Sequence, residues 1–331
     1  MVHLRIVVPS ERAGKILDLL DATPSVCNLV HLAGAARRPK GDVILCDVAR
    51  EDASVVIEDL KELDVPRDGS ISMEQIDSQL SDAADRAVRA ARGAPSDAVI
   101  WEEVEARTSE SIELSGSFLS FMVLACLIAS VGIFLGSPIL IVGAMVVGPE
   151  FGPIAGLCVA MVERRRDVAW RSLTALAVGF PVGITAAFLF TLASRATGLL
   201  GDDFSSTNHP LTQFISQPDD FSFIVACFAG AAGVLSLTSA KSGALIGVLI
   251  SVTTIPAAAN IGVAAAFADW SEWRGAMAQL LVNLTAILLA GFFTLRIERR
   301  LYERRRQRHR GEDSRARAGL PTETERPSAR R

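Results

Sequence analysis

The chain of 331 residues contains few of the residues that commonly bind metals or cofactors. It has four His, five Cys and one Tyr, with no Cys-x-x-Cys pair and no Cys/His cluster at metal-ligand spacing. The sequence therefore predicts neither a zinc module nor a disulfide framework. It also lacks the Gly-Lys-Ser/Thr segment of a phosphate-binding loop. We accordingly expect no bound cofactor or metal.

Charged residues are sparse in the middle of the chain. Residues 117–295 hold 9 acidic and 7 basic side chains, whereas residues 1–116 hold 22 and 13, and residues 296–331 hold 6 and 13. This contrast excludes an ordinary soluble enzyme, a coiled coil and a disordered chain. It predicts four parts: a cytoplasmic domain over 1–77, a helical linker over 78–116, a membrane domain over 117–297 and a basic, largely disordered cytoplasmic tail over 298–331.

The first 77 residues have the pattern of a small α+β domain. Runs rich in β-branched residues predict strands, helical spacing of apolar residues predicts two helices, and the segment GAARRPKG (34–41) predicts a hairpin loop. The strands are expected at 3–8, 26–32, 42–48 and 70–76, and the helices at 10–21 and 55–63. The order β-α-β-β-α-β predicts a ferredoxin-like domain. The first apolar stretch is too short for a signal peptide, so we expect this domain in the cytoplasm.

Six apolar runs follow, and most reach the roughly 20 residues that span a bilayer. The runs are 118–136, 138–162, 173–194, 222–239, 242–268 and 276–295. The loop 163–171 carries four Arg, whereas the loop 195–221 carries four Asp and one Arg. Because basic loops stay on the cytoplasmic side, we expect both termini inside a multi-pass protein of a bacterial inner membrane, with the lipid bilayer as its partner.

The second and fifth runs resemble each other. Both are long and carry Pro near the middle, in GAMVVGPEFGPIAG (143–156) and GVLISVTTIPAAANIG (247–262). A unit of three spans places the second copy in the membrane from the opposite face. The sequence therefore predicts a 3+3 inverted repeat, a plan common among secondary transporters.

Both Pro-containing runs have a polar or glycine-rich break, and two interpretations of it remain open. One is a kinked helix that packs tightly through small residues. The other is a discontinuous helix whose freed backbone groups line a site at the membrane midplane. The candidate binding residues are Gly148, Pro149, Glu150, Gly152 and Pro153 in the second run, and Thr253, Thr254, Pro256 and Asn260 in the fifth.

Glu150 is the only Asp, Glu, Lys, Arg or His inside the six runs. A charge at the bilayer centre costs about 2.5–3.5 kcal/mol on insertion scales. One interpretation is a proton- or cation-binding group of a transport pathway. The other is a protonated structural carboxyl that bridges two helices.

The segment SPILIVGAMVVGPEFGPIAGL (137–157), with its GAM-x-x-x-P-x-x-GP core, resembles a family of bacterial and archaeal hydrophobic proteins catalogued as domain of unknown function 389. The resemblance covers roughly residues 110–260 and implies an integral membrane protein. It implies no activity. Many members of that family have a hydrophobic residue at the position of Glu150.

Two classes of function remain after enzymes are set aside. The apolar runs offer one Glu and no His or Asp, too little for an intramembrane catalytic site, so we expect no enzyme. No nucleic-acid motif accompanies the basic tail. The first class is a secondary transporter or channel for an unidentified small solute or ion, with a regulatory cytoplasmic domain. The alternative is a non-transporting membrane scaffold or signalling protein. Small-residue faces of the runs serve packing within the chain and self-association equally well, and we expect a homo-oligomer of unspecified order.

Overall fold

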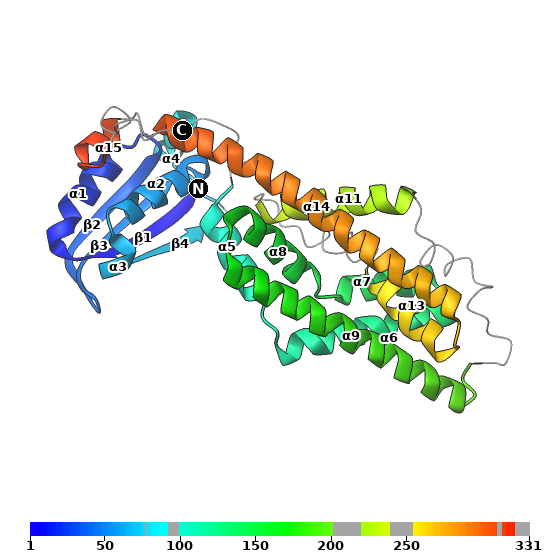
Figure 1. The fold of residues 1–331 in the computed structure, drawn as a ribbon. Coiled ribbons are helices and arrows are strands. Elements are labelled where there is room, and N and C mark those ends of the chain that lie inside the picture. Colours follow the sequence, from blue (N-terminus) through cyan, green and yellow to red (C-terminus); the bar gives the residue numbers. More distant parts are fainter. Residues whose placement is uncertain (77, 92–98, 201–219, 239–253, 310–312, 322–331) are drawn as a thin grey trace. The chain divides into compact units, whose positions relative to one another are not determined.

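The computed structural model describes residues 1–76, 78–91, 99–200, 220–238, 254–309 and 313–321 (Figure 1). The chain forms two compact units, which are described separately. The first contains Met1–Glu102 and Glu298–Arg331, and the second contains most of Glu103–Ile297.

The first unit contains a small antiparallel sheet of four strands in the order β2-β3-β1-β4 (Figure 1). The sheet and its helices follow the chain as β1 (Val2–Val8), α1 (Ser10–Asp21), β2 (Val26–Arg37), β3 (Lys40–Val48), α2 (Arg50–Glu62), α3 (Val65–Asp68) and β4 (Ser70–Gln75). Every expected strand is present, and β1 shows the alternation of buried and less buried residues that is typical of a half-buried strand. In β1 the buried residues are Val2, Leu4, Ile6 and Val8, which lie in one apolar core with α1 and α2.

The hairpin between β2 and β3 is much tighter than the sequence predicts. The expected loop over 34–41 is mostly strand, since Ala36 pairs with Gly41 and Arg37 pairs with Lys40. Only Arg38 and Pro39 make the turn. Pairing across the hairpin satisfies backbone groups that a longer loop would leave to water, and a register shift between Leu32 and Ala36 accommodates the small residues.

The described parts of the linker and of the tail contain helices. The linker contains α4 (Asp82–Ala90) and α5 (Trp101–Ser111), and residues 92–98 between them lie outside the described residues. The tail differs from the predicted disordered segment. Residues 298–309 continue helix α14 (Trp270–His309), α15 (Asp313–Arg317) follows, and Ala318 and Leu320 join the core of the first unit. A basic segment orders here because acidic side chains of α2 bind it, as described below.

The second unit is an apolar helical bundle. Its helices are α6 (Gly116–Phe134), α7 (Pro138–Val147), α8 (Phe151–Glu163), α9 (Arg166–Ala196), α11 (Asp220–Thr238), α13 (Ile255–Ala266) and most of α14. Among the described residues, α6, α9, α11 and α14 are long and apolar enough to cross a membrane, and the bent pair of α7 and α8 raises the candidates to five. Six spans and a 3+3 repeat are therefore not established. The structure describes the fifth run only from residue 254. Its helix α13 begins at Ile255 and has 12 residues.

Helix α13 is buried along almost its whole length, and Gly262 marks its closest approach to α9. A Cβ at Gly262 would lie 2.6 Å from the carbonyl oxygen of Ile184 and 2.8 Å from the backbone nitrogen of Phe188. Backbone atoms cannot move aside as a flexible side chain can. The two helices therefore pack at this distance only with glycine at position 262.

We expect Gly262→Ala to destabilise the bundle by about 1–3 kcal/mol, the usual cost of overpacking. Thermal unfolding of the full chain in detergent measures the effect. Gly143→Ala in α7 is the matched control, since a Cβ there meets nothing within 4 Å. Equal melting temperatures for the two variants would contradict the close packing of α13 on α9.

Candidate functional site

The second expected span is broken at its middle. Helix α7 ends at Val147, α8 begins at Phe151, and the two helices are bent by 53°. Pro149 and Pro153 cause the break, because neither residue has a backbone N–H for the helical hydrogen-bond ladder. Helical bonding restarts when the Ile154 N–H donates to the carbonyl of Glu150 at 3.2 Å. The span is therefore discontinuous, and the interpretation that its freed backbone groups line a site at the membrane midplane stays a prediction.

Glu150 lies in this break and is 0% exposed. Its carboxylate accepts a hydrogen bond of 2.8 Å from Thr254 Oγ1. Glu150 immediately precedes α8, and Thr254 immediately precedes α13. One carboxyl group therefore joins the starts of two helices, where unpaired N–H groups and the helix dipole create positive potential.

Gly148 makes room for the carboxyl group. A Cβ at this position would lie 2.5 Å from Glu150 Oε2 and 2.8 Å from Ile255 Cγ1. A larger residue would push Glu150 away from Thr254. Gly148, Glu150 and Thr254 are thus three predicted site residues that the fold brings together across 104 positions of sequence.

The other predicted site residues occupy different surroundings. Pro149 is part of the break itself, while Pro153 and Pro256 are buried in the first turns of α8 and α13. Gly152 faces α5, because its Cβ would lie 2.6 Å from the carbonyl oxygen of Ser111. Asn260 donates from Nδ2 to Glu272 Oε1 at 3.0 Å. Thr253 lies outside the described residues.

Two buried amides of α14 escaped the sequence prediction. Gln279 is 4% exposed and Asn283 is 0% exposed, and Gln279 Nε2 donates to Asn283 Oδ1 at 3.4 Å. Both residues lie inside the apolar run 276–295. Gln279 and Asn283 are not ionisable, so the charge pattern does not reveal them. The signal that could have found them is an amide side chain inside an apolar run.

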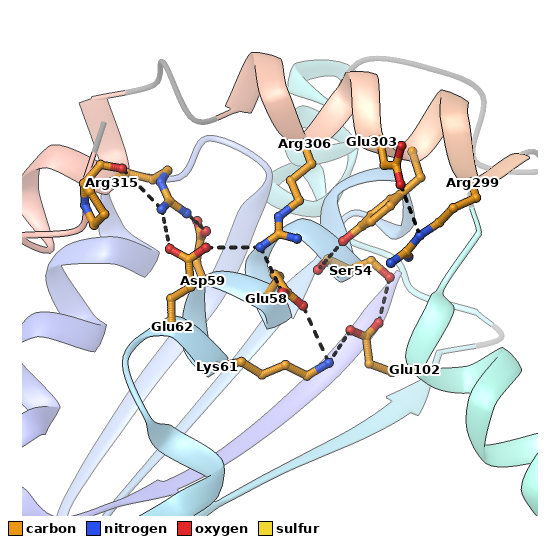
Figure 2. Close-up of polar contacts among 12 residues, drawn as sticks. Ser54, Glu58, Asp59, Lys61, Glu62, Glu102, Arg299, Glu303, Arg306 and Arg315 are labelled. Carbon is orange, nitrogen blue, oxygen red and sulfur yellow. Dashed lines mark hydrogen bonds and ion pairs between the residues drawn. The ribbon is translucent and has the colours of Figure 1, made fainter. Parts of the chain in front are cut away.

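In the first unit, a charged cluster joins the tail to α2 (Figure 2). Asp59 is 1% exposed and forms an ion pair with Arg315, which is also 1% exposed. Arg315 Nη2 donates to Glu62 at 2.5 Å, and His309 Nε2 lies 2.9 Å from Asp59 Oδ2. The acid at the centre of the cluster therefore has two partners from the tail.

The cluster continues along α2 toward α5. Arg306 lies 2.8 Å from Glu58 and 3.1 Å from Glu62. Lys61 lies 2.8 Å from Glu102, whose other carboxylate oxygen accepts from Ser54 Oγ at 2.8 Å (Figure 2). In these pairs each acidic side chain lies beside a basic one, so the charges balance. Such an arrangement is typical of residues that hold two segments together.

The sheet carries a second polar cluster, around Asp42. Its carboxylate accepts from Ser10 Oγ at 2.6 Å and from the Gly34 N–H at 3.0 Å, and it lies 2.7 Å from His31 Nε2. The hydrogen bond from Ser10, followed by those from Gly34 and His31, lowers the pKa of Asp42 from 3.8 to about 2. The folded state therefore favours the ionised carboxylate.

A lowered pKa in the folded state stabilises the fold above the unfolded-state pKa and loses this effect on acidification. We expect Asp42→Asn to be less stable than wild type above pH 3.8, with the difference vanishing toward pH 2. Fluorescence of Trp101 during unfolding at a series of pH values measures it, with the other three Trp replaced by Phe. Asp21→Asn, at the exposed end of α1, is the control. A constant difference across this pH range would exclude the assigned role.

The break after α7, helix α8 and Thr254 lie in a segment that is similar to known proteins. Residues 145–289 match the family model of a domain of unknown function, DUF389. The match confirms the resemblance carried by the GAM-x-x-x-P-x-x-GP motif, and it includes both Glu150 and Thr254. The chain is also 26% identical over 192 residues to an uncharacterized protein of Methanocaldococcus jannaschii. The aligned part is 58% of this chain and 57% of that relative. No solved structure matches the chain.

Proposed function

We propose that this DUF389-domain protein is a secondary transporter or channel for a small solute or ion, and that Glu150 binds the coupled proton or cation. The observation that carries the proposal is the buried Glu150 carboxyl at the meeting point of the starts of α8 and α13. Discontinuous helices that meet near the middle of a bundle are the usual place of a transporter's binding site.

The energetic cost of Glu150 supports a functional role. Burial of a carboxylate in an apolar bundle costs several kcal/mol unless other groups compensate for it. A hydrogen bond to a charged group stabilises the folded state by only about 1.5–3 kcal/mol. A neutral Gln or Leu at position 150 would form the same helix junction at a lower free-energy cost. An acid at this position is therefore better explained by a function in which the side chain gains and loses a charge.

The proposal also includes the membrane setting. We place both termini in the cytoplasm of a bacterial inner membrane, since the loop 163–171 carries four Arg. The N-terminal domain is proposed to be ferredoxin-like, which its strand order β2-β3-β1-β4 supports. Its regulatory role is part of the same proposal. Six spans in a 3+3 repeat, a homo-oligomeric assembly and the absence of catalysis belong to the same proposal.

The experiment is a flux measurement with the full chain in liposomes. A pH gradient is imposed, internal pH is followed with a dye, and solutes are added in pools. Solute-dependent proton movement above that of protein-free liposomes supports a coupled transporter. If no pool of solutes or cations produces any flux, the alternative of a membrane scaffold or signalling protein takes its place.

A further inference from the structure

Two buried carbonyl oxygens of the bundle have no hydrogen-bond partner. Asn260 Oδ1 and Gln279 Oε1 are both inaccessible to solvent, and neither finds a donor in the described part of the chain. Each such group left unpaired costs about 1–3 kcal/mol. Both atoms are acceptors, so whatever occupies the neighbouring space presents a positive charge or a hydrogen-bond donor.

The local sequence explains why Asn260 presents its oxygen. Asp269 and Glu272 have the spacing of a capping box at the start of α14, and the Glu272 N–H donates to Asp269 Oδ1 at 3.1 Å. The Asp269 N–H, which Glu272 would bind in a complete box, donates instead to the carbonyl of Ala264 at 3.0 Å. The Glu272 carboxylate therefore accepts from Asn260 Nδ2. Because a carboxylate binds the amide nitrogen, the Asn260 oxygen must face away from Glu272.

These groups follow one face of α14. Glu272, Gln279 and Asn283 are seven and four residues apart, which places them on the same side of a helix, with about 10 Å of rise between the first two. Asn260 lies against the beginning of this face through its bond to Glu272. We name these four residues the α14 polar face. It offers two successive acceptor positions, the Asn260 oxygen and the Gln279 oxygen, and its negative charge is that of Glu272, which binds the nitrogen of the Asn260 amide.

We propose that the α14 polar face binds a monovalent metal cation, Na⁺ or K⁺, at these two positions in turn. Carbonyl and carboxylate oxygens suit hard cations. One carboxylate together with neutral amide oxygens balances a single positive charge, which favours a monovalent over a divalent ion. Several weak positions in series permit an ion to enter and to leave. The inference deepens the proposed transport function and rests on it for the movement of the ion, but not for its binding.

Cation-dependent stability tests the binding step. The full chain is unfolded by heat in detergent with NaCl, KCl or choline chloride at equal concentration, and the metal concentration that gives half of the stabilisation is determined. We expect Na⁺ or K⁺ to raise the melting temperature above that in choline. Asn260→Leu and Gln279→Met should each raise the half-effective concentration at least ~10-fold, equal to about 1.4 kcal/mol.

Two further variants keep the test decisive. Glu272→Gln retains an acceptor for Asn260 but removes the charge, so it should weaken the metal effect even if Asn260→Leu fails to fold. Thr285→Val removes an exposed hydroxyl elsewhere on α14 that donates to the Leu281 carbonyl, and should leave the metal effect unchanged. If wild type melts alike in the three salts, or the variants keep the wild-type metal effect, water fills the space and the inference fails. Metal-dependent stability without any flux would instead contradict the proposed function alone.

Discussion

Glu150→Gln is expected to reduce solute-dependent proton movement in liposomes to the level of protein-free vesicles. Glutamine preserves the size of the side chain, and its carbonyl oxygen can still accept the hydrogen bond that Thr254 Oγ1 donates at 2.8 Å. It cannot bind a proton or neutralise a cation. The helix junction should therefore form normally while coupling is lost, and the internal pH dye used for the wild type measures the difference.

Two further variants separate coupling from folding. Thr254→Val removes the hydroxyl that donates to Glu150 and should slow the flux without eliminating it, because the carboxyl group remains. Glu303→Gln changes the same residue type in the first unit, where Glu303 pairs with Arg299 at 3.8 Å, and should transport like wild type. Wild-type flux in Glu150→Gln would show that this carboxyl is structural.

Asp59→Asn is expected to release the tail from the first unit. The substitution removes the buried carboxylate that pairs with Arg315, which is 1% exposed, and leaves Arg315 with Glu62, whose side chain is 23% exposed. Loss of one partner of a buried ion pair typically costs about 3–5 kcal/mol. Hydrogen–deuterium exchange of the full chain, resolved by peptide, should show faster exchange in α15 and in the segment of α14 beyond Arg306.

The control for the tail is an exposed ion pair of α14. Glu303→Gln removes the partner of Arg299 near the surface, where such pairs contribute about 0–1 kcal/mol, and should leave exchange in α15 unchanged. The double variant Asp59→Leu and Arg315→Leu should recover part of the protection, since it buries no lone charge. Equal exchange in wild type and Asp59→Asn would mean that the remaining ion pairs of Arg306 and Arg315, with the apolar contacts of Ala318 and Leu320, hold the tail without Asp59.

The small sheet was predictable because a half-buried strand alternates between apolar and polar residues. His3, Arg5 and Val7 alternate with the buried Leu4 and Ile6, and that period is visible without any knowledge of the partner strands. The length of the β2–β3 hairpin was not predictable in the same way. Small and basic residues such as Ala36 and Arg37 are typical of loops, and only the pairing with β3 extends the strand through them.

The helix break and its acid were also visible in the sequence, because Pro and an isolated Glu are rare inside an apolar run. The partner of Glu150 was among the predicted residues, since the fifth run repeats the pattern of the second. Asn260 shows the limit of this reasoning: it shares a helix with the residues after Thr254 but binds Glu272. The docking of the tail depends on Asp59 and Arg315, 256 positions apart, and composition alone favours a solvated segment.

The protonation of Glu150 is the central claim, and infrared difference spectroscopy of the full chain in lipid films tests it most directly. Spectra are recorded as the pH is stepped, for wild type and for Glu150→Gln. The account predicts a carbonyl stretching band of a protonated carboxyl that appears and disappears in wild type and is missing in the variant. Identical difference spectra for the two proteins would contradict it, because Glu150 would then hold one protonation state throughout.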